Sequence, residues 1–222
     1  MSLRPPTVVP LGEAAWTVVL GDRVDPAIHE RVLAAAGRLA AAGLAGVQEI
    51  IPAYAALTVY FDPERSDPTA IREQLLALAL DAGPFPSPRA SGAPASRLVT
   101  IPVRYDGADL ELVAERTGLT RDEVVARHTG REYRVYLLGF APGWAYLGEL
   151  DPALVLPRRP EPRTRVPAGS VAIGGAQTGV YPLATPGGWH LLGSTALRMF
   201  DPTRDPPVLL QPGDRVRFEA IR

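Results

Sequence analysis

The sequence predicts an α+β domain of the ferredoxin-like kind followed by a mainly β barrel. The first 82 residues give the order strand, helix, strand, strand, helix, which is most of a ferredoxin-like sandwich. The stretch GPFPSPRASGAPAS at 83–96 is rich in Pro, Gly, Ser and Ala, as inter-domain linkers are. Beyond it, short β-type segments alternate with Gly- and Pro-rich turns, as in small barrels. We therefore expect domains at 1–84 and 97–222, joined by a linker at 85–96.

The elements of the first domain follow from local signals. Asp25 stands before Pro26 as an N-cap, and helical apolar spacing then continues as far as Gly43. Asp67 opens a second helix in the same way. The expected elements are a strand at 14–20, a helix at 27–42, strands at 47–52 and 56–61 joined by a turn at 53–55, and a helix at 69–82.

The second domain is expected to consist of short strands with two helices. Thr120 and Glu123 have the spacing of a capping box at the start of one helix. The tail contains a Pro-Gly-Asp turn that leads into a closing strand. The expected strands are 97–105, 133–138, 170–173, 179–181, 189–192 and 215–220, and the expected helices are 110–117 and 121–128.

Composition excludes several chemistries. The 222 residues include no Cys, which excludes disulfides, thiol nucleophiles and thiolate metal sites. All 23 basic residues are Arg, so there is no Schiff-base lysine, and Arg must hold any anion that is bound by side-chain charge. The net charge of -1 gives no field that recruits nucleic acid or an anionic membrane, and no stretch has the length of a membrane span or the form of a signal peptide. We expect a cytoplasmic protein that binds neither nucleic acid nor membranes.

The segment from Leu138 to Gly193 is the most constrained part of the chain, because Gly and Pro recur every few residues between aromatic side chains. Its glycine pairs, 174–175 and 187–188, either present backbone N–H groups to a carboxylate, carbonyl or phosphate ligand or form hairpin turns. Neither pair fits a phosphate-loop or dinucleotide fingerprint. The segment predicts a shaped surface in a β-rich domain.

Four arginines occupy a stretch of this segment that prolines interrupt: Arg158, Arg159, Arg163 and Arg165. We expect an extended loop there, because Pro favours extended backbone. Such a loop suits recognition of an anion or a partner protein. A solvated basic loop explains the pattern equally well.

Three histidines are the titratable candidates for acid–base chemistry. His29 is expected on the exposed side of the first helix. His128 ends a helix, where a cation meets the negative end of the helix dipole, so a structural role is expected. His190 lies beside Trp189 in the Gly-rich segment and is the best candidate for proton transfer. The three do not form a metal-binding pattern.

Carboxylates are scarce in the same segment, with none between Pro162 and Asp201. Ser170 and Ser194 are available as hydroxyl groups, but neither lies in a nucleophile-elbow motif. A hydrolase that acts alone usually needs a carboxylate or a metal at its site. The scarcity predicts that this chain supplies a surface or half of a site.

Five ordered motifs carry a family resemblance: GFAPGWAYL at 139–147, PRR at 157–159, RTRVPAGSV at 163–171, QTGVYP at 177–182 and TPGGW at 185–189. They resemble the 5-oxoprolinase B-subunit family, which is also known as the allophanate hydrolase subunit 1 family and includes the Kip-type sporulation kinase inhibitor. The likeness covers nearly the whole chain, and motifs of this length and order are specific.

The resemblance implies a ferredoxin-like domain followed by a cyclophilin-like β-barrel. It also implies partners, namely the 5-oxoprolinase C subunit, which is a second cyclophilin-like barrel, and the A subunit. The implied complex opens 5-oxo-L-proline to L-glutamate and consumes ATP, without a bound metal, and which of its members binds ATP stays open. The chain would then be a non-autonomous subunit of an ATP-dependent lactam hydrolase.

Two alternatives implied by the same family stay open. One is inhibition of a sensor histidine kinase. The other is a role as an allophanate hydrolase or urea carboxylase-type carboxyltransferase subunit. In the second case any biotin would arrive on another protein, because this chain has no Lys to carry it.

The motif match also implies which residues form the site. Ser194 departs from the family pattern, which commonly has Arg at this position, and the change removes an anion contact. His128 and His190 are candidates for a catalytic role that the motifs do not assign. The implied substrate-binding residues are Arg165, Gly175, Gln177, Thr178, Tyr181, Gly187, Gly188 and Trp189.

Overall fold

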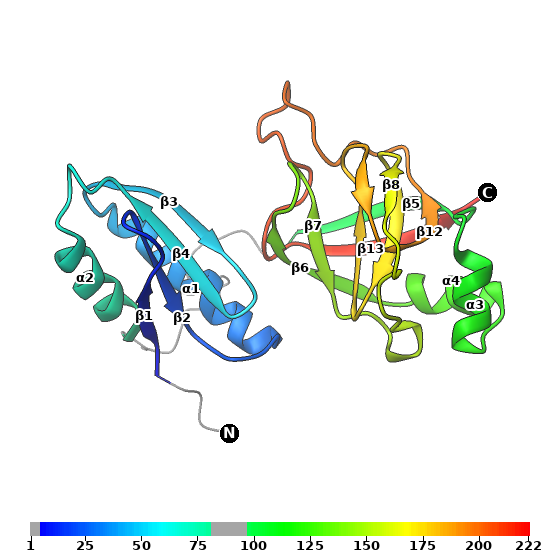
Figure 1. Cartoon of the computed structure of the whole chain (residues 1–222), viewed down its shortest axis with the longest axis horizontal. Coiled ribbons are helices and arrows are strands. Elements are labelled where there is room, and N and C mark those ends of the chain that lie inside the picture. The colour runs from blue at the N-terminus through cyan, green and yellow to red at the C-terminus, as the bar shows by residue number, and fades with distance from the viewer. Residues whose placement is uncertain (1–4, 81–96) are drawn as a thin grey trace. The chain divides into compact units, whose positions relative to one another are not determined.

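The computed structural model describes residues 5–80 and 97–222. The chain forms two compact units that divide between residues 95 and 96, and each has a hydrophobic core of its own (Figure 1). The segment expected to be a linker, 85–96, lies outside the described residues, so that linker stays a prediction.

The first unit is an open, antiparallel four-stranded sheet in the order β1-β2-β4-β3. Both helices pack against the sheet and against each other, and their apolar side chains form one core with those of the strands. The elements are β1 (Thr7–Pro10), β2 (Ala15–Val19), α1 (Pro26–Ala42), β3 (Val47–Pro52), β4 (Ala56–Phe61) and α2 (Pro68–Leu80).

The five elements expected from the sequence are present in this unit, and β1 is an additional strand. In a ferredoxin-like fold the fourth strand follows the second helix. Here the edge strand next to β2 is β1, which precedes β2 in the chain, and β4 lies on the other side of β2. The ferredoxin-like assignment therefore stays a prediction.

Capping determines where α1 begins and ends. The Asp25 carboxylate accepts the N–H of Ala27 at 2.8 Å, and Gly43 closes the helix with a φ of 56°, as the sequence predicts. The expectation that His29 is exposed is wrong. His29 is fully buried, because it lies next to Ile28 within the broad side of α1 that faces the core.

The second unit is a closed barrel of seven strands in the order β10-β7-β6-β13-β5-β12-β9, and it confirms the mainly β barrel. Strands β13 and β5 run parallel, and the other neighbours are antiparallel. Helices α3 and α4 pack on each other and against β12 and β13 (Figure 1). The elements are β5 (Leu98–Arg104), α3 (Leu110–Thr117), α4 (Arg121–Thr129), β6 (Glu132–Leu138), β7 (Ala145–Gly148), η1 (Pro152–Leu154), β8 (Arg163–Val166), β9 (Ser170–Gly174), β10 (Gln177–Val180), β11 (Thr185–Gly187), β12 (His190–Ser194) and β13 (Arg215–Ile221).

Strands β7, β8 and β11 are absent from the sequence-based expectation. The expected loop is wrong at Arg163 and Arg165, which lie in β8, and β8 pairs with β11 in a separate two-stranded sheet. Gly187 belongs to β11 and not to a hairpin turn. Strands of only three or four residues have no readable periodicity, so pairing between distant segments decides them.

Strand alternation gives the barrel two apolar faces. Val171 and Ile173 of β9 point into the main core of the barrel, whereas Ala172 between them joins a second, smaller apolar cluster. Successive side chains of a strand point to opposite faces. The smaller cluster therefore lies on the outer face of β9, where the candidate site is found.

His128 lies at the centre of a buried hydrogen-bond chain inside the barrel. The hydroxyl of Thr178 donates to the carbonyl of Ala172 at 3.0 Å, so it accepts from His128 Nε2 at 2.8 Å. Nδ1 of His128 then accepts from the Tyr105 hydroxyl at 2.7 Å. The His128 ring also stacks on Phe218 with 4.5 Å between ring centres. Burial lowers the pKa of His128 from its ordinary 6.5 to about 3, so the ring is neutral at neutral pH.

Acidification is expected to destabilise the barrel through His128. The unfolded chain binds a proton at this histidine below about pH 6.5, whereas the folded chain does so only near its lowered pKa, so stability is lost as the pH falls between these values. Between about pH 7 and about pH 5 the loss from this residue should be about 2 kcal/mol. Chemical unfolding of the wild type and of His128→Gln at both pH values measures it, and the variant should lack this part of the loss. An identical pH dependence in both proteins would contradict the buried, neutral state.

Candidate functional site

Four aromatic side chains form the centre of the candidate site on the outer face of the barrel. They are Trp144, Tyr146, Tyr181 and Trp189, and we call them the aromatic cluster. Trp144 meets Tyr181 at 4.6 Å and Trp189 at 5.0 Å between ring centres, both edge to face. Trp144, Tyr181 and Trp189 are almost fully buried, so the cluster is a small second core with a preferred ring geometry.

Glycines make room for these rings. A Cβ atom on Gly174 would lie 2.8 Å from the Trp189 ring, and one on Gly187 would fall on the Tyr181 hydroxyl. These two glycines therefore serve the packing of aromatic rings against strands β9 and β11. This requirement explains part of the Gly-rich pattern without any contact to a ligand.

Phe140 extends the aromatic cluster to the surface. Its ring packs edge to face on Trp144 at 5.7 Å, yet 66% of the residue is exposed. Its φ of 71° lies in the left-handed region, which bulky residues rarely adopt. Such backbone strain concentrates at functional sites.

The arginine-bearing segment lies against the aromatic cluster. The backbone N–H of Arg159 donates to the carbonyl of Gly188 at 2.8 Å, and Arg163 is the strand partner of Gly187. The Arg158 guanidinium lies 5.7 Å from the centre of the Trp189 ring, within the range of a cation–π contact. Cationic groups and aromatic rings therefore share one surface.

Asp109 is the carboxylate of this site, and it is absent from the residues expected from the sequence. The residue is 3% exposed. Its Oδ1 accepts from Arg159 Nη1 at 3.0 Å and from Arg163 Nη2 at 2.8 Å, and its Oδ2 accepts from the N–H of Leu191 at 2.7 Å. Burial acts to raise the pKa of Asp109, but the hydrogen bonds from Arg163 and Leu191 and the charges of both arginines lower it overall. The carboxylate is therefore ionised and fully engaged.

The sequence offers only a misleading signal for Asp109. The residue immediately precedes α3, where an aspartate ordinarily caps the helix. Its side chain makes no capping hydrogen bond, because it turns instead toward arginines 50 and 54 residues further along the chain. Nothing in the local sequence distinguishes the two roles.

Several buried polar atoms around the cluster have no hydrogen-bond partner among the described residues. They are Trp144 Nε1, Arg159 Nε, Arg163 Nη1, Thr185 Oγ1 and His190 Nδ1. The indole and guanidinium nitrogens are donors only, so they match the acceptor oxygens of a ligand. Buried polar groups are normally satisfied, and a group of exceptions in one place calls for an explanation.

His190 is buried at the edge of this region, with 1% of its surface exposed. Its Nε2 lies 2.9 Å from the carbonyl of Pro157, which can only accept, so Nε2 carries the proton and donates. Nδ1 has no hydrogen-bond partner among the described residues, and it carries a lone pair whenever the ring is neutral. His190 is thus equipped to accept a proton or a hydrogen bond from a ligand.

The structure brings some of the expected site residues together and separates others. Tyr181, Gly187, Gly188, Trp189 and His190 lie in or beside the aromatic cluster. Burial raises the pKa of Tyr181 in spite of the opposing hydrogen bond from the backbone of Trp189, which keeps the phenol neutral.

The remaining expected residues lie elsewhere in the barrel unit. Thr178 and His128 belong to the buried hydrogen-bond chain of the barrel interior. Gly175 and Gln177 flank the β9–β10 turn, where the N–H of Gly175 donates to the carbonyl of Leu156 at 2.8 Å and is therefore engaged. Arg165 is exposed on β8.

Ser194, the departure from the family pattern, is exposed, and its hydroxyl donates to Asp106 at 3.1 Å. A hydroxyl in this place satisfies a neighbouring carboxylate. It brings no positive charge to the surface of β12.

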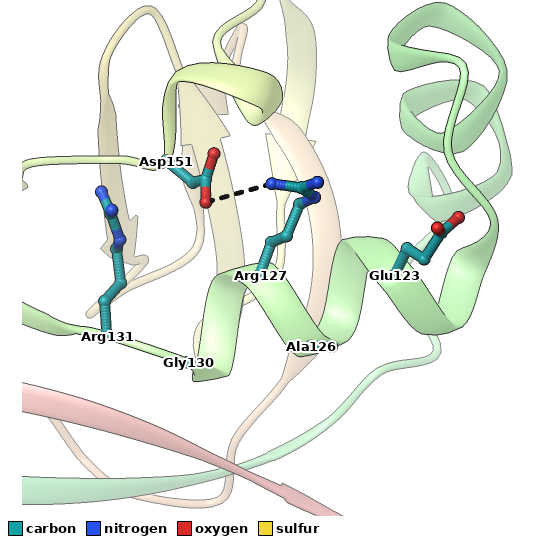
Figure 2. A pocket seen from close by; sticks show the side chains of 6 residues that line it. All are labelled: Glu123, Ala126, Arg127, Gly130, Arg131 and Asp151. Atoms are coloured by element: carbon teal, nitrogen blue, oxygen red, sulfur yellow. Dashed lines mark ion pairs between the residues drawn. The ribbon is translucent and has the colours of Figure 1, made fainter.

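A separate pocket of about 420 Å³ lies beside α4, lined by Glu123, Ala126, Arg127, Gly130, Arg131 and Asp151 (Figure 2). Arg127 forms an ion pair with Asp151 at 3.5 Å, and Arg131 donates to the carbonyl of Glu149 at 2.9 Å. Its arginines are thus engaged with neighbouring groups, and no residue implied by the motifs lines it.

Two further properties concern the described residues only. Within 5–80 and 97–222, no group of three or more His, Asp or Glu side chains is placed to hold a metal ion. In the same ranges, every helix is too short or too polar to cross a bilayer.

Sequence comparison finds clear relatives. The family model described as carboxyltransferase domain, subdomain C and D, matches residues 6–210. The 5-oxoprolinase B subunit of Escherichia coli O157:H7 is 46% identical over 216 residues, which are 94% of this chain and 93% of that protein. The 5-oxoprolinase B subunit of Bacillus subtilis (strain 168) is 40% identical over 228 residues, which cover 95% of this chain and 91% of that protein.

Solved structures agree in fold. The crystal structure of TTHA0988 matches with a TM-score of 0.82 and 44% identity over 94% of this chain, which spans only 40% of that longer chain. The urea carboxylase of Kluyveromyces lactis matches with a TM-score of 0.73 over 99% of this chain and 23% of its own, at 19% identity, which is a likeness of fold alone. From the relatives at 46% and 40% identity and the family model, the chain belongs to the 5-oxoprolinase B-subunit family, which is one of the carboxyltransferase-domain proteins.

Proposed function

We propose that this chain is the B subunit of an ATP-dependent 5-oxoprolinase that opens 5-oxo-L-proline to L-glutamate. The observation that carries the proposal is the 46% identity to a 5-oxoprolinase B subunit over 94% of this chain and 93% of that protein. An identity of this level over nearly the whole of both proteins supports a shared function. The chain works with a second barrel protein, the C subunit, and with the A subunit.

The polar groups around the aromatic cluster suit this substrate. 5-Oxoproline is a flat lactam ring that carries a carboxylate, so it presents acceptor oxygens at two places and one N–H donor. Trp144 Nε1, Arg159 Nε and Arg163 Nη1 are donors that have no partner among the described residues. The lone pair of His190 Nδ1 matches the lactam N–H.

Ring opening adds water across the lactam C–N bond. The hydroxyl goes to the carbonyl carbon and the proton goes to the nitrogen, which becomes the amine of glutamate. ATP hydrolysis to ADP and phosphate drives the reaction. His190 is the residue of this chain that we assign to proton transfer, because its Nδ1 carries a buried lone pair.

A shared site follows from what this chain lacks. No Asp or Glu lies between Pro162 and Asp201 in the sequence, and the carboxylate that reaches this surface from elsewhere, Asp109, is held by two arginines. His190 is the proton-transfer group that we assign to this chain, and we expect another member of the complex to supply the carboxylate that assists it. Exposed Phe140 beside the cluster suits contact with such a partner.

Carboxyltransferase activity of the urea carboxylase type is the second candidate. It is favoured by the match to the carboxyltransferase-domain family over residues 6–210. Biotin would then be delivered by another protein, because no Lys is present in this sequence. The kinase-inhibitor hypothesis has no specific observation in its favour and stays a prediction.

Activity is expected only from the assembled complex. ATP hydrolysis that depends on 5-oxoproline should be absent with this chain alone and present when it is co-purified with the A and C subunits. Turnover by the isolated chain would contradict the shared site. Co-purification of all three without turnover would contradict the substrate, and a carboxylation assay with a biotin carrier would then be the next measurement.

Replacing Arg165 or Gln177 by Ala is expected to lower the turnover of the complex. Both residues lie outside the aromatic cluster, so this expectation rests on the substrate-binding role that the motifs imply. Loss of one hydrogen bond to a charged ligand group should reduce turnover roughly tenfold or more. Arg217→Ala is the matched control, because Arg217 is also an exposed strand arginine of the barrel, but its partner is Glu132. Circular dichroism should show an unchanged fold in all variants. Wild-type turnover in both test variants would remove these residues from the site.

A further inference from the structure

We propose that Arg159 and Arg163 form a receptor for the carboxylate of a small ligand, and that Asp109 is the positioning residue that holds them in place. The inference deepens the proposed function and rests on the same surface. It assigns the carboxylate end of the ligand to this chain and not to another member of the complex.

The net charge of the cluster favours a bound anion. Two guanidinium groups meet one carboxylate, so the cluster of Arg159, Arg163 and Asp109 carries one uncompensated positive charge. The two arginine side chains are only 28% and 24% exposed, so water screens this charge incompletely. A partly buried excess of positive charge is stabilised by a bound anion.

The hydrogen bonds of Asp109 leave guanidinium nitrogens of both arginines without a partner. Asp109 Oδ1 engages one terminal nitrogen of each arginine, Nη1 of Arg159 and Nη2 of Arg163. Nε of Arg159 and Nη1 of Arg163 are buried and have no partner among the described residues. Each guanidinium therefore keeps at least one nitrogen that has no partner among the described residues, and planar donor forks match carboxylates.

Hydrogen bonds hold the two arginine side chains in place before any ligand binds. The N–H of Leu191 in β12 fixes the other carboxylate oxygen of Asp109 at 2.7 Å. Asp109 is thereby tied to the barrel wall, and the long arginine side chains are tied to Asp109. A receptor whose side chains are already ordered loses less entropy when the ligand binds.

The neighbouring groups fit the remainder of such a ligand. The backbone of Arg159 is hydrogen-bonded to Gly188, next to Trp189 and His190. A carboxylate on the arginines therefore places its attached ring near the aromatic cluster. A flat heterocyclic carboxylic acid matches this arrangement, whereas the same ring without a carboxylate loses the contacts to the arginines.

A purely structural ion-pair cluster makes a different prediction. In that case Asp109 and the arginines stabilise the fold, and replacing them lowers the melting temperature without changing which ligands bind. The preference for a carboxylate over its absence is therefore the decisive readout, because a structural role does not affect it.

The experiment titrates the isolated full chain with 5-oxo-L-proline and with 2-pyrrolidinone, which has the same lactam ring without the carboxylate. Indole N–H signals in NMR report binding, since the indole of Trp144 lies in the site. 5-Oxo-L-proline should bind about tenfold or more tightly than 2-pyrrolidinone. Acetate should compete with 5-oxo-L-proline if the arginines recognise the carboxylate itself.

Three variants complete the test. Arg163→Gln should bring the affinity ratio of the two ligands close to one, and Asp109→Asn should lower the ratio even where the protein remains folded. Arg163 lies on the two-stranded sheet outside the barrel, so its variant keeps the test valid if Asp109→Asn does not fold. Arg121→Gln is the control that removes one arginine from an exposed ion pair with Glu111 and should leave the ratio unchanged.

Equal affinity for the two lactams, no binding of either, or an unchanged ratio in Arg163→Gln would each overturn the proposal. These outcomes are independent of turnover. A complex that hydrolyses ATP with 5-oxoproline while the isolated chain ignores the carboxylate would support the proposed function and refute this inference. The reverse result would support the receptor and refute the substrate assignment.

Discussion

The ion-pair cluster around Asp109 is the interaction on which the surface of the barrel depends. One buried carboxylate joins three segments that are distant in sequence: the start of α3, the arginine-bearing segment with β8, and the first residues of β12. Removing it would leave two partly buried cations without compensation, which is far costlier than losing a surface ion pair. The segment that carries Arg159 and Arg163 is thereby fixed against the barrel, and the backbone contact between Arg159 and Gly188 carries this order to the aromatic cluster.

The inner face of strands β9 and β10 contributes to the stability of the barrel, and the outer face carries the candidate site. On the inner face, Thr178 binds His128 in a dry core where the histidine is neutral and every ring nitrogen is satisfied. On the outer face, Ala172 and Gly174 leave space for large rings, and polar atoms remain unpaired among the residues that the structure describes. The contrast agrees with the structural role expected for His128, although its ring is neutral and not the cation that the helix end suggested. Both ring nitrogens of His128 form hydrogen bonds within the fold, whereas Nδ1 of His190 has no partner among the described residues.

What the sequence could predict depended on whether the signal was local. The caps at Asp25 and Thr120 were readable because each is contained within a few residues, and the structure has both. Strands β8 and β11 were not readable, because segments of three or four residues become strands only by pairing with each other. The burial of His29 depends on the width of the buried side of α1. The role of Asp109 depends on arginines more than 40 residues away, and helix-capping rules point elsewhere. The pattern could not show that Gly174 and Gly187 make room for the rings of Trp189 and Tyr181, because these contacts join segments that are not adjacent in sequence.

The chemical groups around the aromatic cluster also favour a partner protein. Several donors beside the aromatic cluster have no partner among the described residues, Asp109 is engaged by arginines, and Phe140 is exposed on a strained backbone next to the cluster. Binding a carboxylate needs only the donors, whereas hydrolysis of a lactam also needs an activated water molecule and a route for phosphate chemistry. The described residues of this chain supply the donors, and in the proposed complex a partner would bring the remaining groups. A protein that holds one half of such a site gains activity only when a partner covers the aromatic surface, excludes bulk water and brings the missing groups to the ligand. In the proposed complex, catalysis therefore requires assembly, since the surface that recognises the ligand is also the surface that the partner must cover.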